Sequence, residues 1–188
     1  MKAVCVFCGS NTGLRQEFTE GARSLGKLIA ERNYTLVYGG GNVGLMGELA
    51  QAAISSGGEV VGVIPEAIYR LVDHAEITSL QVVPDMHTRK NTMYELSDGF
   101  IALPGGIGTI EELMEIYTWG QLGYHTKPVG ICNIAGFYDA FLEFFRHMVD
   151  SQFLKPVHHK NLLVSDSPEK LLDKMESFKP VLANKLMK

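Results

Sequence analysis

The chain has 188 residues, 46% of them hydrophobic, which suffices for one sizeable core and is too short for two ordinary domains, so we expect a single domain over 1–188. Its 17 Lys and Arg against 21 Asp and Glu, with no long run of like charges, argue against nucleic acid as a partner. We see no basic leader at the N-terminus and no apolar run near the ~20 residues that span a bilayer, so we expect a cytoplasmic protein without membrane contact.

Short apolar runs alternate along the chain with longer segments of helical period, as in an α/β protein. The expected strands lie near 3–8, 35–38, 59–64, 80–84, 99–103, 128–132 and 161–164. The expected helices lie near 15–32, 43–57, 88–97, 109–122, 136–150 and 167–177. The least regular stretch, Pro65 to Ser79, fits a flap or a short helix. Because most strands are apolar throughout, we predict a three-layer α/β/α Rossmann-like open sheet of mostly parallel strands with helices on both faces.

Three cysteines include a C-x-x-C at Cys5 and Cys8, a spacing that also occurs in redox pairs. A redox pair places its attacking thiol at a helix N-terminus, whereas Cys5 lies in the middle of an expected strand. We therefore interpret the cysteines as buried, reduced thiols.

Three strand-to-helix turns are rich in glycine or small polar residues, namely Gly9-Ser10-Asn11, Gly39 to Gly44, and Pro104 to Thr109. Each turn follows a strand, and open parallel sheets bind ligands at the carboxyl ends of their strands. Glycines let a phosphate approach the backbone, and the free N–H groups of the following helix hold its charge. Taken singly, each of these loops is better explained by a tight turn. Three on one edge favour a nucleotide.

The second loop also matches G-x-G-x-x-G at Gly39, Gly41 and Gly44, and Glu66 lies where a dinucleotide fold carries its ribose-binding acid. An NAD-dependent enzyme is therefore one alternative. However, the match follows the second strand instead of the first, and the more pronounced loop at 104–109 would have no purpose. A mononucleotide uses both loops.

The third loop runs into Thr109-Ile110-Glu111-Glu112, which has the pattern of a capping box with Thr109 as the cap and Glu112 reaching back to it. Capping alone would explain Glu112. Against this interpretation, Glu111 and Glu115 lie beside it, and three acids at a presumed phosphate site are unusual unless one of them acts on the substrate.

The segment from Pro84 to Asn91 follows the fourth expected strand and carries Arg89 and Lys90. Such cations are usually solvated surface residues. If the strand pairing is right, Arg89 lies beside the 104–109 loop, where it can bind a phosphate or stabilise a developing charge.

These two segments resemble the Lonely Guy family of phosphoribohydrolases, which activate cytokinins by removing ribose 5-phosphate. Pro104 to Glu112 carries P-G-G-x-G-T-x-x-E, Met86 to Lys90 carries M-H-x-R-K, and the segments 7–11 and 38–47 are similar as well. The resemblance covers nearly the whole chain. It implies that Arg89 and Glu112 are the catalytic pair, that the 105–109 loop holds the phosphate, and that the protein is a homodimer. Such proteins were formerly labelled lysine decarboxylases. The sequence does not support this label, because no lysine lies in an identifiable pyridoxal phosphate site.

We therefore expect hydrolysis of the N-glycosidic bond of an adenine-type (cytokinin riboside) nucleoside 5′-monophosphate to free base and ribose 5-phosphate. Plain AMP and an N6-prenylated form are alternative substrates, because the choice between them depends on the shape of the pocket. Glu112 would stabilise the oxocarbenium-like state and orient water, although Glu111, otherwise a ligand of the ribose hydroxyls, can exchange roles with it. No metal or cofactor is expected. The alternative is a nucleotide-binding or carrier protein without turnover, which does not require Glu112. The expected substrate-binding residues are Ser10, Gly40, Gly41, Met86, Lys90, Gly105, Gly106, Gly108, Thr109 and Glu111.

The helices near 109–122 and 136–150 carry more apolar residues than one sheet face can cover. In the first, Met114, Trp119 and Leu122 lie off the main apolar face, and in the second Tyr138 and Leu142 do so. We expect these helices to form the homodimer interface, a deeply buried helix in a monomer being the alternative.

Overall fold

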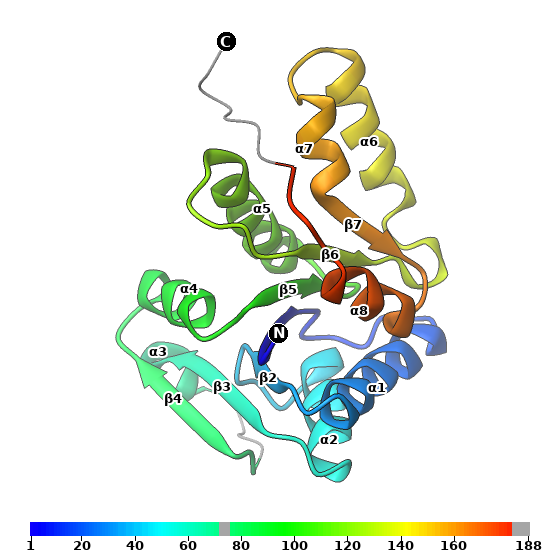
Figure 1. Ribbon diagram of the computed structural model, residues 1–188. Helices are drawn as coiled ribbons and strands as arrows, with labels where there is room; N and C mark the ends of the chain where they lie inside the picture. Colours follow the sequence, from blue (N-terminus) through cyan, green and yellow to red (C-terminus); the bar gives the residue numbers. More distant parts are fainter. Residues whose placement is uncertain (72–75, 182–188) are drawn as a thin grey trace.

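The computed structural model describes residues 1–71 and 76–181 and contains one seven-stranded sheet, with strand order β4-β3-β2-β1-β5-β6-β7 (Figure 1). Every neighbouring pair of strands is parallel. The predicted open parallel sheet is therefore confirmed. The strands are β1 (Ala3–Phe7), β2 (Thr35–Tyr38), β3 (Val60–Pro65), β4 (Ser79–Val83), β5 (Gly99–Ala102), β6 (Val129–Cys132) and β7 (Leu162–Ser165).

Helices connect the strands, and most begin within two residues of their predicted positions. The helices are α1 (Gln16–Glu31), α2 (Gly44–Ser55), α3 (Glu66–Tyr69), α4 (Met86–Glu95), α5 (Ile107–Leu122), the 3-10 turn η1 (Ile134–Gly136), α6 (Asp139–Asp150), α7 (Pro156–Asn161) and α8 (Pro168–Glu176). The sequence did not predict α7, whose six residues carry no helical period of apolar side chains. The irregular stretch after Pro65 contains the short helix α3, while 72–75 lie outside the described residues.

Alternate residues of each strand pack into two separate cores, one on each face of the sheet. On β1, for example, Val4 and Val6 join the core that contains buried residues of α1, α2 and α8. Cys5 and Phe7 join the other core, to which α4, α5 and α6 contribute. This alternation is the period of two that a strand imposes, and it explains why strands covered on both faces have no polar side. The three layers follow from it (Figure 1).

The order of the strands reverses direction at β1, which pairs with β2 on one side and with β5 on the other. In open parallel sheets this reversal leaves a crevice at the carboxyl ends of the strands, because the connections on its two sides run in opposite directions. Here the turn after β1 and the turn after β5 meet across it, with the Gly9 N–H donating to the Pro104 carbonyl at 3.0 Å.

All three cysteines are unpaired, and Cys5 and Cys132 are buried, as the sequence predicts, whereas Cys8 is partly exposed. Burial raises the pKa of the Cys5 thiol, and the charge of Glu112 adds to the effect. The redox interpretation of C-x-x-C gains no support from such thiols. Within the described ranges, no helix is long and apolar enough to cross a bilayer.

Candidate active site

A cleft of about 510 Å³ opens at the carboxyl edge of the sheet and draws its walls from the turns after β1, β2 and β5 and from α3, α4 and α5. This volume lies within the range that holds small-molecule ligands and cofactors. Its floor combines charged side chains with apolar ones. The lining residues are Val6, Phe7, Cys8, Gly9, Ser10, Gly39, Gly41, Val43, Met46, Ile64, Ile68, Met86, Arg89, Met93, Gly106, Ile107, Gly108, Thr109, Glu111 and Glu112.

Arg89 and Glu112 form an ion pair in this cleft, with 2.5 Å between Arg89 Nη1 and Glu112 Oε1. Both side chains are only 12% exposed. The Arg89 Nε also donates to the Val63 carbonyl at the end of β3, at 3.0 Å, so the guanidinium is held in one orientation. α4 and α5 thus bring together the two residues that the sequence nominated for catalysis.

Burial raises the pKa of Glu112 above its usual value, and the attraction of Arg89 opposes this effect without cancelling it. Nearby, burial and the Glu112 charge raise the pKa of the Cys8 thiol. Cys8 therefore stays protonated and is a poor nucleophile, although it lines the cleft. The reactive group with a perturbed pKa at this site is the carboxyl of Glu112.

The start of α5 differs from the predicted capping box. α5 begins at Ile107 with Gly106 as its N-cap, and no side chain caps it. Thr109 is the third residue of the helix, so its hydroxyl cannot serve as the N-cap and Glu112 has no cap to reach back to. The capping explanation of Glu112 is therefore wrong, and its carboxylate is bound to Arg89 instead.

The N-terminus of α5 opens into the cleft, whereas that of α2 is closed. A Cβ at Gly106 or Gly108 would meet nothing within 4 Å. At α2, by contrast, the Leu45 N–H donates to the Gly9 carbonyl at 3.0 Å, and a Cβ at Gly44 would lie 2.2 Å from the backbone of Ser10. Since an anion needs free N–H groups and room to approach, the start of α5 is the more open of the two helix N-termini.

This packing leaves less room for an anion at the start of α2, on which the NAD alternative depended. Its proposed ribose acid, Glu66, is exposed at the start of α3, does not line the cleft, and pairs with Arg70 one turn away. The G-x-G-x-x-G match at 39–44 therefore reflects tight packing of α2 against the first loop.

Lys90 lies beside Arg89 on α4 but binds other acids. Its Nζ is 2.5 Å from Glu111 Oε1 and 3.0 Å from Glu115 Oε1. Burial opposes the charge of Lys90, yet the hydrogen bonds with Glu111 and Glu115 raise its pKa above the usual value. The ammonium therefore stays charged, and two parallel ion-pair groups join α4 to α5.

The other predicted substrate-binding residues divide between the cleft and its surroundings. Gly40 has a positive φ of 78° and packs beneath the cleft against Ile64 and Leu80. Gly105 lines an adjoining cavity of about 200 Å³ next to Phe18 and Phe137, and Lys90 does not line the cleft. The predicted residues that do line it are Ser10, Gly41, Met86, Gly106, Gly108, Thr109 and Glu111.

Sequence reasoning missed two features of the cleft. Gly39 was considered only as part of a phosphate loop, but it faces the guanidinium of Arg89. Of the apolar wall, which comprises Met46, Ile64, Ile68, Met86 and Met93, only Met86 was predicted, because the other residues come from separate elements and share no motif.

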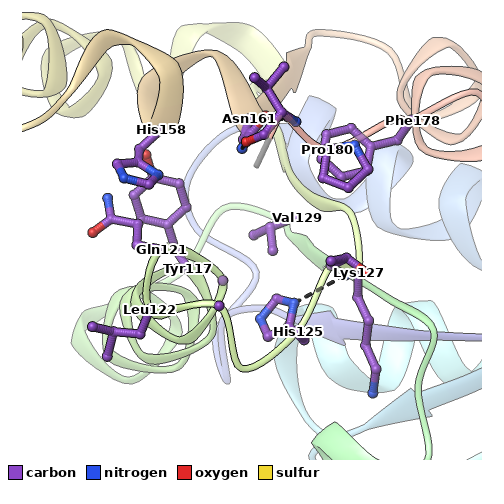
Figure 2. A pocket seen from close by; sticks show the side chains of 14 residues that line it. Tyr117, Gln121, Leu122, His125, Lys127, Val129, His158, Asn161, Phe178 and Pro180 are labelled. Atoms are coloured by element: carbon purple, nitrogen blue, oxygen red, sulfur yellow. Dashed lines mark hydrogen bonds between the residues drawn. The ribbon is translucent and has the colours of Figure 1, made fainter. Parts of the chain in front are cut away.

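A second pocket, of about 280 Å³, lies at the other end of β6, near the C-terminal end of α5 (Figure 2). Both ring nitrogens of its lining residue His125 are hydrogen-bonded: Nδ1 accepts from the Lys127 N–H at 3.1 Å and Nε2 donates to the Ile116 carbonyl at 2.9 Å. Burial lowers the pKa of His125, so the ring is neutral and structural. Lys127 extends away from the pocket (Figure 2) and its Nζ donates to the Tyr94 carbonyl.

Across residues 1–71 and 76–181, no three His, Cys, Asp or Glu side chains are placed to hold a metal ion.

Comparisons with known proteins identify similar sequences and folds. Residues 46–175 match the family model described as "Possible lysine decarboxylase". The chain is 43% identical over 180 residues to the cytokinin riboside 5′-monophosphate phosphoribohydrolase LOG1 of Arabidopsis thaliana, covering 95% of this chain and 84% of the relative. It is 46% identical over 176 residues to the probable cytokinin riboside 5′-monophosphate phosphoribohydrolase LOGL1 of Oryza sativa subsp. japonica, covering 93% and 79%.

Among solved structures, the molybdenum cofactor binding protein of Rippkaea orientalis superposes with a TM-score of 0.71 at 21% identity, over 94% of this chain and 97% of the other. The molybdenum cofactor carrier protein of Chlamydomonas reinhardtii superposes with a TM-score of 0.70 at 20% identity, over 94% and 98%. At this level of identity the likeness is one of fold.

Proposed function

The chain belongs to the family of the cytokinin riboside 5′-monophosphate phosphoribohydrolases, the Lonely Guy family, and on this premise we propose that it hydrolyses the N-glycosidic bond of an adenine-type nucleoside 5′-monophosphate. The products are free base and ribose 5-phosphate. The observation that carries the proposal is the buried pair Arg89–Glu112, which shares one cleft with the open N-terminus of α5.

The 5′-phosphate binds at the first turn of α5, where Gly106 and Gly108 leave the backbone accessible and the helix dipole favours negative charge. Thr109 Oγ1 lies in the same turn and adds a hydroxyl donor. Anchoring the phosphate there fixes the position of the anomeric carbon, so binding energy far from the reacting bond is used for orientation. Nucleosides without the phosphate are therefore poor substrates.

Glu112 acts on the ribosyl group. As the C1′–N bond breaks, the base leaves with the bonding electrons and positive charge develops on the sugar, which a nearby carboxylate stabilises. The same carboxylate orients a water molecule whose oxygen bonds to C1′, and the proton that this water loses balances the one that the base takes up. Arg89 fixes the Glu112 carboxylate and offsets its charge, and its remaining N–H groups are donors for the ribose or phosphate.

The base lies against the apolar wall formed by Met46, Ile64, Ile68, Met86 and Met93. Methionine side chains are flexible and polarisable, and they pack well against planar rings and branched alkyl groups. This wall supports adenine with an apolar N6 substituent as well as plain AMP, and the methionines adapt to either.

We also propose that the protein is a cytoplasmic homodimer. The three unpaired cysteines suit a reducing compartment. For the dimer, support comes from α6 and its neighbourhood, where Phe144 is 56% and Phe153 87% exposed. The apolar residues of α5 give less support than the sequence suggested, because Met114 and Trp119 pack partly against the core. Tyr138 is buried and its hydroxyl donates to the Leu103 carbonyl, so it is not an interface residue of the kind predicted.

Incubation with AMP and with isopentenyladenosine 5′-monophosphate, followed by chromatography for the free base, tests the proposal directly. Base released from either nucleotide by the wild-type protein, and not by a Glu112→Gln variant, supports it. Tight binding of both nucleotides without release of base contradicts it and favours the carrier alternative.

A further inference from the structure

Two neighbouring cations of α4 have different surroundings. Successive helical residues point about 100° apart, so Arg89 reaches the cleft while Lys90 points along the seam between α4 and α5. The Lys90 side chain is 11% exposed, and its ammonium lies between Glu111 and Glu115. Of these two acids, Glu111 lines the cleft and Glu115 does not.

We propose that Lys90 is a positioning residue that holds Glu111 at the rim of the cleft and keeps its carboxylate away from the bound phosphate. This inference rests on the proposed function, because it concerns the site assigned to the 5′-phosphate. It replaces direct contact between Lys90 and substrate, which the sequence suggested. Lys90 acts on the substrate only through Glu111.

The geometry supports an indirect role. Both ion-pair distances of Lys90, 2.5 and 3.0 Å, are those of hydrogen-bonded partners, so two of its three donors are engaged with α5. Glu111 is 52% exposed, and its carboxylate would be free to turn toward the cleft if the ammonium did not hold it. Glu111 begins the second turn of α5, close to the first-turn N–H groups assigned to the phosphate.

The electrostatics point the same way. Glu111 and Glu115 are four residues apart on one helix face, an arrangement in which like charges repel. Lys90 neutralises part of this charge next to the site of a phosphate dianion. Without it, Glu111 and Glu112 would face the phosphate with Arg89 as the remaining cation of the two ion-pair groups. Affinity for the phosphate should therefore fall, more strongly at low than at high ionic strength.

Binding of ribose 5-phosphate, measured by titration calorimetry at two salt concentrations, tests this idea without requiring turnover. Lys90→Met keeps the apolar stem but removes the charge, and we expect its Kd to rise roughly two- to tenfold, the range for a partly exposed charge interaction. Lys90→Arg should bind nearly as tightly as the wild type. In steady-state assays of Lys90→Met, KM should rise more than kcat falls.

Two double variants separate positioning from contact. Lys90→Met/Glu111→Gln should recover much of the lost affinity, because the freed carboxylate has been neutralised. Lys90→Met/Glu115→Gln is the matched control and should recover much less, since Glu115 lies outside the cleft. Equal, weak binding by Lys90→Met and both doubles would mean that Lys90 touches the phosphate itself, and would overturn the inference.

Other outcomes are also decisive. A lower melting temperature of Lys90→Met with an unchanged Kd would leave Lys90 with a structural role alone and overturn the inference. Wild-type protein that does not bind ribose 5-phosphate would remove the phosphate site and the inference with it. If ribose 5-phosphate binds and the variants follow the expected order, but no base is released from any nucleotide, the inference stands while the proposed function fails.

Discussion

The guanidinium of Arg89 fills the space that a side chain at Gly39 would need. A Cβ built on Gly39 falls 2.4 Å from Arg89 Nη2, closer than any real Cβ contact. The end of β2 is therefore shaped around the arginine of α4, and the absence of a side chain at this one position allows the Arg89–Glu112 pair to form.

Gly39→Ala should displace the guanidinium without unfolding the chain, because the Cβ meets only ends of the Arg89 and Met46 side chains and Gly39 has no positive φ. We expect kcat/KM to fall roughly 10- to 100-fold, the cost of a small misplacement of catalytic groups. Steady-state kinetics measure the loss, and thermal unfolding checks the fold. Wild-type kinetics in a folded Gly39→Ala protein would show that the position of Arg89 is unimportant.

Replacing either member of the buried pair should abolish most turnover. Glu112→Gln keeps shape and hydrogen bonding but not charge, and we expect kcat to drop by ~10²–10⁴. Arg89→Lys retains a cation but loses the planar fork that binds Glu112 and the Val63 carbonyl together, so it should also be severely impaired. Glu111→Gln, assayed in parallel, should lose less. A Glu112→Gln enzyme with more than about half of the wild-type kcat would contradict the mechanism.

Gly106→Val should weaken the binding of nucleotides selectively. Its φ of −92° is open to any residue and its Cβ would contact no protein atom, so the fold should survive. The added methyl groups would instead occupy the space through which a phosphate reaches the backbone, raising KM for AMP. Adenosine binding, which involves no phosphate, serves as the control. Equal loss for AMP and adenosine, or none for either, would locate the phosphate elsewhere.

The pH dependence of kcat/KM should report Glu112. The enzyme needs the ionised carboxylate, and burial raises its pKa above the ordinary value. Activity should therefore decline, as the pH falls, at a higher pH than an exposed glutamate of pKa about 4.3 would give. Lys90→Met should shift this acid limb of the pH profile to still higher pH, because the charge of Lys90 lowers the pKa of Glu112 whereas the charge of Glu111 raises it. An acid limb that does not respond to these charges belongs to another group.

Light scattering at micromolar concentration should give a mass close to twice the 20.7 kDa of the chain. Phe144→Glu should shift the protein toward the monomer, since it would bury a charge in an interface through α6. Its melting temperature should hardly change in the monomer, because Phe144 is largely exposed there. A wild-type mass close to that of the monomer would contradict the proposed homodimer.

The sheet was predictable because most strands are apolar throughout and several are followed by glycine or small residues, a pattern that reports local and tertiary requirements together. The start of α5 could not be predicted correctly. Thr109 and Glu112 have the spacing of a capping box, which places the helix start at Thr109, but Ile107 and Gly108 are already helical. Nothing in a local pattern shows which of several possible N-caps tertiary packing selects.

Arg89 and Glu112 could be predicted to meet at one edge of the sheet, because both lie next to the carboxyl ends of strands and their residue types suit the proposed chemistry. The role of a residue could not be predicted where it depends on contacts between elements that are distant in the sequence. Lys90 follows Arg89 directly and carries the same charge. Only the rotation of about 100° between successive helical residues directs Arg89 into the cleft and Lys90 toward Glu111. The role of Gly39 and the positions of Met46 and Met93 in the cleft were missed for the same reason.

Arg89 and Glu112 are only 23 residues apart in the chain, on consecutive helices joined by β5, whereas Met46, Ile64 and Ile68 come from the preceding half. In the proposed mechanism, bond cleavage thus depends on one stretch of sequence, whereas three of the five residues proposed to contact the base come from another, the other two being Met86 and Met93 of α4. Substitutions between residues 43 and 68 can therefore change the specificity for the substituent on the base while the sequence of the α4–β5–α5 unit stays the same. Chimaeras that exchange residues 43–68 between relatives should accordingly trade substrate preference and retain turnover.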